Sequence, residues 1–220
     1  MVLAAGLFFL AARDYFGYEY FYRYTAAREQ ATNLKGSFGA LEPQLRRAIS
    51  FSGNPLFYQE LGRLYLEMAL AENKFGTPER RDEYLDQARE SLEKLIRRNP
   101  LDPFGYYELG KVYILYNFPL LTYATKGRTY LRKAVDIRPL DKDLNVNVIH
   151  AYLAQWDKLS AAERDFVYAA VSRNLETNVH FFPRLLALWM SEYKDSGKMK
   201  AIFSENNDLW PKLARFFPVQ

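Results

Sequence analysis

The sequence predicts an all-helical protein built from consecutive helical hairpins. Apolar residues recur at the 3.6-residue spacing of an α-helix along almost the whole chain, and no segment alternates between apolar and polar residues for long. A short pattern of aromatic residues around a Leu-Gly pair also occurs twice, beginning at Tyr58 and at Tyr106. Periodicity and internal repetition together favour a stack of hairpins, which we expect to follow a hydrophobic, aromatic-rich helix at the N-terminus.

The composition is that of a folded protein with a substantial core. Of the 220 residues, 49% are hydrophobic and 25% are charged, a balance that argues against intrinsic disorder. The formal net charge is only +4 and the basic residues occur as short pairs among acidic ones, so we expect no nucleic-acid partner. The absence of cysteine excludes disulfides, thiolate metal sites and cysteine nucleophiles.

The first 24 residues are predicted to contact a membrane or a hydrophobic partner. Residues 1–12 are apolar or small, but a membrane-spanning helix needs about 20 such residues. An aromatic-rich segment follows, and tyrosines gather where a helix leaves the hydrocarbon for the headgroups. We interpret residues 1–24 as the end of a membrane anchor and its interfacial exit; the alternative is an aromatic helix that packs on the rest of the chain. The predicted contact residues are Leu7, Phe8, Phe9, Leu10, Tyr15, Phe16, Tyr18, Phe21 and Tyr22.

Turn residues divide the first half of the chain into helices. The first helix is expected to end near Asn33, because the segment 35–39 contains two glycines and glycine favours helix ends. The second should cover 41–51, with Pro43 in its first turn, where a missing N–H has no cost. Helices over 55–73, 78–98, 103–116 and 119–137 follow, and Thr77 before Pro78 provides an N-cap for one of them.

The last third of the chain is predicted to continue in the same way. A helix is expected around 145–152, and Ser160 with Glu163 forms a capping box that opens a helix reaching about Asn174. Pro183 and Pro211 frame two or three terminal helices. These helices would cover the exposed end of the stack, as terminal repeats must.

The pattern that occurs twice resembles the tetratricopeptide repeat (TPR). That repeat has an aromatic, a Leu-Gly pair and a tyrosine on its first helix, then alanine on its second helix and a closing proline. The matching residues are Tyr58, Leu61, Gly62, Tyr65, Ala88 and Pro100 in one copy, and Tyr106, Leu109, Gly110, Tyr113, Ala134 and Pro139 in the other. The glycine would allow the two helices to approach closely.

The resemblance implies a TPR-like α-solenoid over residues 25–220. Clear repeats would occupy about 54–100 and 101–139, degenerate repeats 18–53 and 140–180, and capping helices 181–220. TPR stacks bind partners along the inner face of each first helix. Carried onto this sequence, that face is Gln59, Arg63, Leu66, Tyr107, Lys111, Ile114, Val146, His150 and Leu153. A row of Arg63, Lys111 and His150 would suit an acidic or C-terminal peptide; the alternative is that they are solvated helix residues.

No pattern in the sequence predicts catalysis. The two histidines, His150 and His180, share no motif, and Ser-x-x-Lys at Ser91 and Ser191 falls within charged helices without the other elements of an acyl-enzyme site. No arrangement of ligands for a metal or of glycines for a phosphate is present. We therefore expect a non-enzymatic protein without cofactor or metal.

A narrower resemblance covers about residues 5–140. A hydrophobic exit followed by two repeats is similar to the extracytoplasmic TPR extension of bacterial O-antigen ligase and polymerase proteins, although their polytopic catalytic part has no counterpart here. The resemblance implies a membrane-tethered scaffold on the outer side of a bacterial inner membrane, whose partners are subunits of a larger assembly. The alternatives are a detached accessory module of such a glycan-assembly system and a soluble cytosolic peptide-binding adaptor. Arg13, Arg23 and Arg28 favour a cytoplasmic body by the positive-inside rule.

Overall fold

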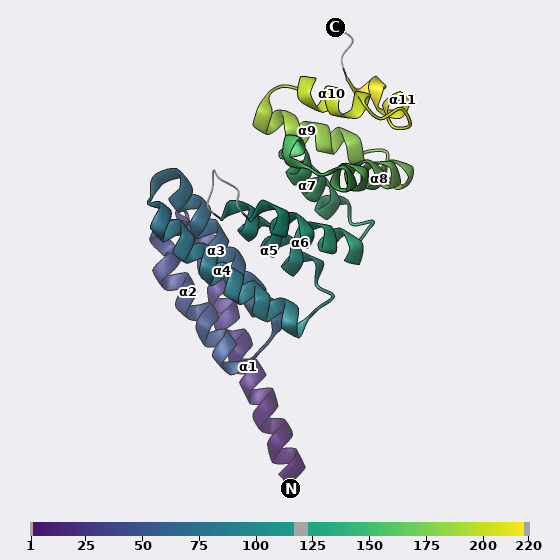
Figure 1. Cartoon of the computed structure of the whole chain (residues 1–220). Coiled ribbons are helices and arrows are strands. Elements are labelled where there is room, and N and C mark those ends of the chain that lie inside the picture. Colours follow the sequence, from purple (N-terminus) through teal and green to yellow (C-terminus); the bar gives the residue numbers. More distant parts are fainter. Residues whose placement is uncertain (1, 117–122, 218–220) are drawn as a thin grey trace. The chain divides into compact units, whose positions relative to one another are not determined.

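The computed structural model describes residues 2–116 and 123–217. Within these ranges the chain forms eleven α-helices and two short 3-10 helices, with no β-strand (Figure 1). The all-helical prediction is confirmed. The chain divides into two compact units, Met1–Tyr130 and Leu131–Gln220, and the boundary falls within α6 (Ala124–Ile137).

Unit 1 is made of helices that pack against their neighbours in the chain. α1 (Val2–Gln30) packs along α2 (Leu34–Phe51), and α3 (Pro55–Phe75) packs along α4 (Pro78–Arg98), which also contacts α5 (Pro103–Leu115). Only short segments connect them, so each pair is an antiparallel hairpin. The core of the unit includes Leu41, Leu45, Leu61, Leu64, Tyr65, Leu85, Ala88, Leu92, Leu95, Leu109 and Tyr113.

Side-chain caps fix where the helices of unit 1 begin. The oxygens of Asn54 and Asp102 accept hydrogen bonds from the backbone N–H groups of α3 and α5, and each cap is followed by a proline at the first helical position. Thr77 caps α4 ahead of Pro78, as predicted. These caps satisfy donors that have no partner within the helix, so the boundaries predicted for the starts of these helices are confirmed.

The predicted break at residues 35–39 is wrong. α2 begins at Leu34, and Asn33 caps it by accepting from the N–H of Lys35 at 3.0 Å. Both glycines of the segment are helical, and Pro43 lies in the middle of the helix rather than in its first turn. Phe38 explains the extension, because its ring packs against those of Tyr65 and Tyr84, at centroid distances of 5.7 and 5.4 Å. The cap and this aromatic contact outweigh the low helix propensity of glycine and proline.

Gly62 forms the close helix contact that the sequence predicted for it. A Cβ atom built on Gly62 would lie 2.6 Å from Cγ of the buried Leu92, so α3 and α4 approach too closely there for any side chain but hydrogen. A Cβ on Gly127 would lie 2.7 Å from the carbonyl oxygen of Gly110, which marks a similar approach of α5 and α6. Ala88 and Ala134 are fully buried, whereas Pro100 is exposed at the end of its helix.

Unit 2 is a second group of helices. It contains α7 (Lys142–Leu153), α8 (Ala161–Thr177), α9 (Phe181–Tyr193), α10 (Gly197–Ser204) and α11 (Trp210–Leu213), with 3-10 helices at Trp156–Lys158 and Ala214–Phe216. The capping box at the start of α8 is confirmed. All three tryptophans of the chain lie in this unit: Trp156 and Trp189 are buried, and Trp210 is half-buried.

Two buried amides connect the first helices of unit 2. Asn145 on α7 and Asn174 on α8 are almost completely buried, and Nδ2 of Asn145 donates to Oδ1 of Asn174 at 3.3 Å and to the carbonyl of Pro139 at 2.8 Å. Buried polar groups need such partners, so sliding one helix along the other would leave an amide unpaired.

The Gly62 contact is expected to be essential for stability. Gly62→Ala should lower the free energy of unfolding by about 1–3 kcal/mol, because the new methyl group overpacks against Leu92. The matched control is Gly39→Ala in α2, where no atom lies within 4 Å of the added Cβ. The control should raise stability by up to about 1 kcal/mol through helix propensity. Urea unfolding of both variants measures the difference; equal effects would contradict the close contact.

Candidate functional site

The second half of α1 is an integral part of unit 1. Nε of Arg13 donates to the carbonyl of Phe51 at 3.0 Å, and a Cβ on Gly17 would lie 2.7 Å from Cβ of Ser52. One turn further, the ring of Phe21 stacks on that of Phe57, with centroids 5.0 Å apart. The predicted boundary at residue 24 therefore falls inside a continuous helix, and α1 packs as the alternative interpretation expected from about residue 13 onward.

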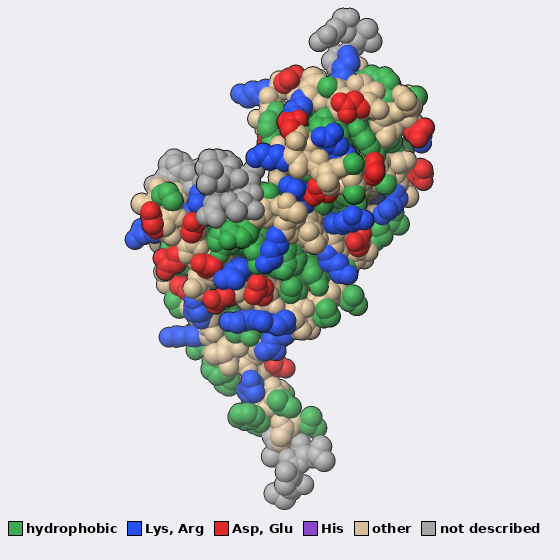
Figure 2. Space-filling model, viewed as in Figure 1, with side chains coloured by type: hydrophobic (Ala, Val, Ile, Leu, Met, Phe, Trp, Pro, Cys, Tyr) green, Lys and Arg blue, Asp and Glu red, His purple; other side chains and the backbone are tan. Residues whose placement is uncertain are grey.

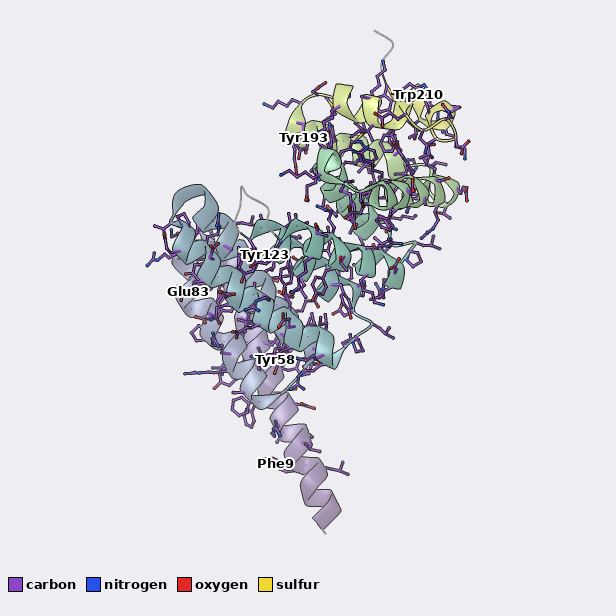
Figure 3. All side chains as sticks on the ribbon, in the orientation of Figure 1. Phe9, Tyr58, Glu83, Tyr123, Tyr193 and Trp210 are labelled. Atoms are coloured by element: carbon purple, nitrogen blue, oxygen red, sulfur yellow. The ribbon has the colours of Figure 1, made fainter. Side chains whose placement is uncertain are left out.

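The first half of α1 projects beyond the other helices of the unit (Figure 1). Leu7, Phe8, Phe9 and Leu10 are consecutive, and between 55% and 77% of each is exposed (Phe9 is labelled in Figure 3). Four residues complete more than one helical turn, so the exposed surface is apolar on every side. In the part of the chain that the structure describes, no helix combines the length and the hydropathy needed to cross a membrane.

The remaining predicted membrane-contact residues divide into two groups. Phe16 packs its ring against Phe51, and Tyr18 and Phe21 pack theirs against Phe57. Tyr15 and Tyr22 are each about two-thirds exposed, at 67% and 66%. The aromatic segment thus attaches α1 to the hairpins on one side and leaves tyrosines in solvent on the other.

The predicted groove face of unit 1 carries a network of ion pairs between α1 and α3. The hydroxyl of Tyr24 donates to Oε2 of Glu60 at 3.3 Å. Arg63 lies 3.3 Å from Oε1 of Glu60 and 4.0 Å from Oε1 of Glu67, and Arg28 pairs with Glu67. The arginine expected to hold a partner's carboxylate therefore already has carboxylate neighbours within the chain.

Helix α5 carries a further pair of opposite charges on this face. Nζ of Lys111 lies 2.7 Å from Oε2 of Glu108 and 5.0 Å from the centre of the Tyr107 ring. Burial, with a smaller contribution from Glu108, raises the pKa of Tyr107 to about 12. Burial opposes the charge of Arg63, but carboxylates that include Glu108 raise its pKa overall. Along α1, α3 and α5, three cations and three carboxylates are thus paired, and their formal charges cancel.

The other predicted groove residues are less accessible. Leu66, Val146 and Leu153 are buried core residues, whereas Gln59 and Ile114 are half-buried. The expected row of three basic residues extends over both units: Arg63 and Lys111 belong to unit 1 and His150 to unit 2.

His150 is enclosed by aromatic side chains of α9. It is 8% exposed, and its ring centroid lies 5.9 Å from that of Trp189 and 6.0 Å from that of Tyr193. Nε2 lies 3.5 Å from Oε2 of Glu192 but makes no hydrogen bond within the described residues. Burial lowers the pKa of His150, and the nearby Glu192 opposes this effect only in part. The imidazole is therefore neutral near pH 7 and suits a core position more than an exposed binding row.

A hollow between three helices of unit 1 was not predicted. It has a volume of about 290 Å³, and its lining includes Tyr123, which is labelled in Figure 3. Nζ of Lys126 donates to the hydroxyl of Tyr113 at 2.9 Å, and Arg89 pairs with Asp86 at 3.0 Å. No local motif marks this site, because its residues are contributed by the separate helices α4, α5 and α6. The lining residues are Asp86, Arg89, Tyr113, Tyr116, Tyr123 and Lys126.

Among the residues described, no group of three or more acidic or histidine side chains could hold a metal ion. Comparisons with known proteins found no family model that matches the chain, no similar curated protein and no similar solved structure.

The buried histidine predicts an acid-sensitive unit 2. The unfolded chain binds a proton near pH 6.5, whereas the folded chain resists protonation of His150, so stability decreases as the pH falls below about 6.5. The loss is at most about 1.4 kcal/mol per pH unit for one group. His150→Gln should flatten the dependence of the melting temperature on pH, and the same change at the exposed His180 should not. An unchanged slope in the His150 variant would contradict this assignment.

Proposed function

We propose that this protein is a non-enzymatic, TPR-like scaffold that is tethered to a membrane through its N-terminal helix and binds other proteins through its helical hairpins. The observation that carries the proposal is the dual character of α1. One continuous helix packs into unit 1 from about Arg13 onward and presents an apolar surface on all sides at residues 7–10. Such a surface is unfavourable in water and marks a contact with lipid or with another protein.

The length of the exposed segment suits a lipid contact. Residues 2–12 of α1 extend about 16 Å at 1.5 Å per residue, which is close to half of a hydrocarbon core of about 30 Å. Tyr15, Phe16 and Tyr18 would then lie at the depth of the headgroups, where aromatic rings with a polar group are favoured. The helix would enter one leaflet and hold unit 1 against the surface.

The paired charges on α1, α3 and α5 support a role in protein binding. Because the cations are already paired within the chain, a ligand with a single carboxylate would gain little binding free energy there. A partner surface or extended peptide of alternating charge would match them better and would exchange one set of pairs for another. The helical hairpins provide a rigid frame that keeps these charges in register.

The tether predicts a specific effect on vesicle binding. In the full chain, Phe8→Gln together with Phe9→Gln should abolish most cosedimentation with phosphatidylcholine vesicles, since two exposed rings would no longer enter the hydrocarbon. Leu140→Gln with Val179→Gln is the matched control, because both residues are exposed apolar side chains of unit 2. If the native chain remains in the supernatant with all vesicles, the tether is wrong.

The binding face can be tested with single cysteines, because the chain has none of its own. A photocrosslinker attached to R63C on α3 should trap a partner protein in native membranes. The same reagent on E83C, at the exposed Glu83 of α4 (Figure 3), should trap much less. Loss of the Arg63 ion pairs should cost at most about 1 kcal/mol of stability, since the side chain is half exposed. Equal trapping from both positions would argue against this face.

A further inference from the structure

The end of unit 1 from which α1 projects has a distinct surface, which we call the base. It consists of residues 10–18 of α1, residues 47–58 around the α2–α3 connection, and residues 94–106 around the α4–α5 connection. Hydrogen bonds and ring contacts join these segments. Arg13 donates to the carbonyl of Phe51, and Nδ2 of Asn54 donates to the hydroxyl of Tyr18 at 2.8 Å. The Arg98 guanidinium lies over the ring of Tyr58, with its Cζ 5.2 Å from the ring centre.

The base is positively charged. Its segments contain five basic residues and two acidic ones, a net formal charge of +3. The opposite end of the unit (24–40, 68–84, 113–116 and 123–126) contains six basic and five acidic residues, a net charge of +1. Figure 2 shows Lys and Arg side chains gathered next to the projecting helix. The basic residues of the base are Arg13, Arg47, Lys94, Arg97 and Arg98, and its acidic residues are Asp14 and Asp102.

Of the two acidic residues of the base, Asp14 is exposed and Asp102 is engaged in capping a helix. Oδ1 of Asp102 accepts the N–H groups of Phe104 and Gly105 as the cap of α5, so it is held against its own backbone. Arg47, Lys94 and Arg97 are exposed. Arg47 lies 5.6 Å from the centre of the Tyr20 ring, a contact with an aromatic rather than with a carboxylate.

Exposed apolar side chains lie among these cations. Leu101 is 74% exposed, and Leu56 and Phe104 are each 38% exposed, all three in the connections or first turns at this end. A surface that combines basic groups with scattered apolar side chains, beside an apolar helix, has the chemistry of a membrane interface. A protein partner would need one surface that fits both the apolar helix and the basic base. An anionic bilayer offers hydrocarbon and negative charge together and requires no specific shape.

We propose that the base is a docking surface for anionic phospholipid headgroups. This inference rests on the proposed membrane tether and adds the lipid class that it selects. When residues 2–12 enter the hydrocarbon, Arg13 reaches the phosphate level and the base faces the headgroups. Attraction between the base and anionic lipids orients unit 1 with its connections against the membrane and its opposite end away from it.

The test compares vesicles of phosphatidylcholine with vesicles that contain equal parts of phosphatidylcholine and phosphatidylglycerol. The full chain should bind the anionic vesicles much more tightly, and added salt should reduce this preference. Each basic residue near the surface contributes about a fivefold change in affinity. Arg47→Gln, Lys94→Gln and Arg97→Gln together should therefore reduce the anionic preference by about two orders of magnitude, without changing binding to pure phosphatidylcholine.

The matched control removes the same charge from unit 2 through Lys142→Gln, Lys158→Gln and Arg173→Gln, all at exposed positions. Circular dichroism verifies that both triple variants are folded. Equal binding of the native chain to both vesicle types, or equal losses in the two triple variants, would overturn the headgroup assignment while leaving the tether in place. If the native chain binds neither vesicle type, the tether and the headgroup assignment both fail.

Discussion

The packing of α1 around Gly17 is the contact on which both the projecting helix and the base of unit 1 depend. The missing side chain at Gly17 brings α1 against Ser52 at the α2–α3 connection, and the stacked rings of Phe21 and Phe57 hold it there. The helix continues without a break from Val2 to Gln30, so no loop separates the exposed N-terminal half from this contact. The direction of the apolar projection is therefore set by core packing and not by a hinge. The position of the base follows from the same contact.

Charge is distributed differently on the two surfaces of unit 1 that we assign to partners. On the face formed by α1, α3 and α5, the cations Arg28, Arg63 and Lys111 each have a carboxylate neighbour, so these charges are balanced. At the base, basic groups exceed acidic ones, and two of them, Arg47 and Arg98, contact aromatic rings instead. A neutral face of paired charges favours a partner whose own charges align with them in position and sign. A surface with net positive charge instead attracts any negatively charged surface at long range. This difference is the reason why we propose a protein partner for one surface and a lipid for the other.

Much of the fold was predictable because local rules decide it. Prolines after capping residues marked the starts of α3, α4 and α5, and the Leu-Gly pair at Gly62 marked the close contact with Leu92. The start of α2 was not predictable, because glycines and a proline argue against helix while the burial of Phe38 against Tyr65 and Tyr84 depends on tertiary contacts. Local propensity is a weak prior in such cases.

The sites were less predictable than the helices. Arg63 and Lys111 were predicted to share a face, but their pairing with Glu60 and Glu108 was overlooked, although each acid stands three residues before its base on the same helix. Spacing along one helix indicates which residues share a face, yet ion pairs such as that of Arg28 with Glu67 join separate helices. The hollow at Tyr123 and the basic base were missed for the same reason, since each collects residues from several helices that are separate in the sequence.

The placement of the tryptophans allows the two units to be distinguished by fluorescence. All three lie between residues 131 and 220, and unit 1 contains tyrosine and phenylalanine as its only aromatic residues. Selectively excited indole emission therefore reports on unit 2 alone, whereas far-ultraviolet ellipticity reports on the helices of both units. Superimposed transitions in the two signals would show that the units melt cooperatively, and separated transitions would show that each is a foldon of its own.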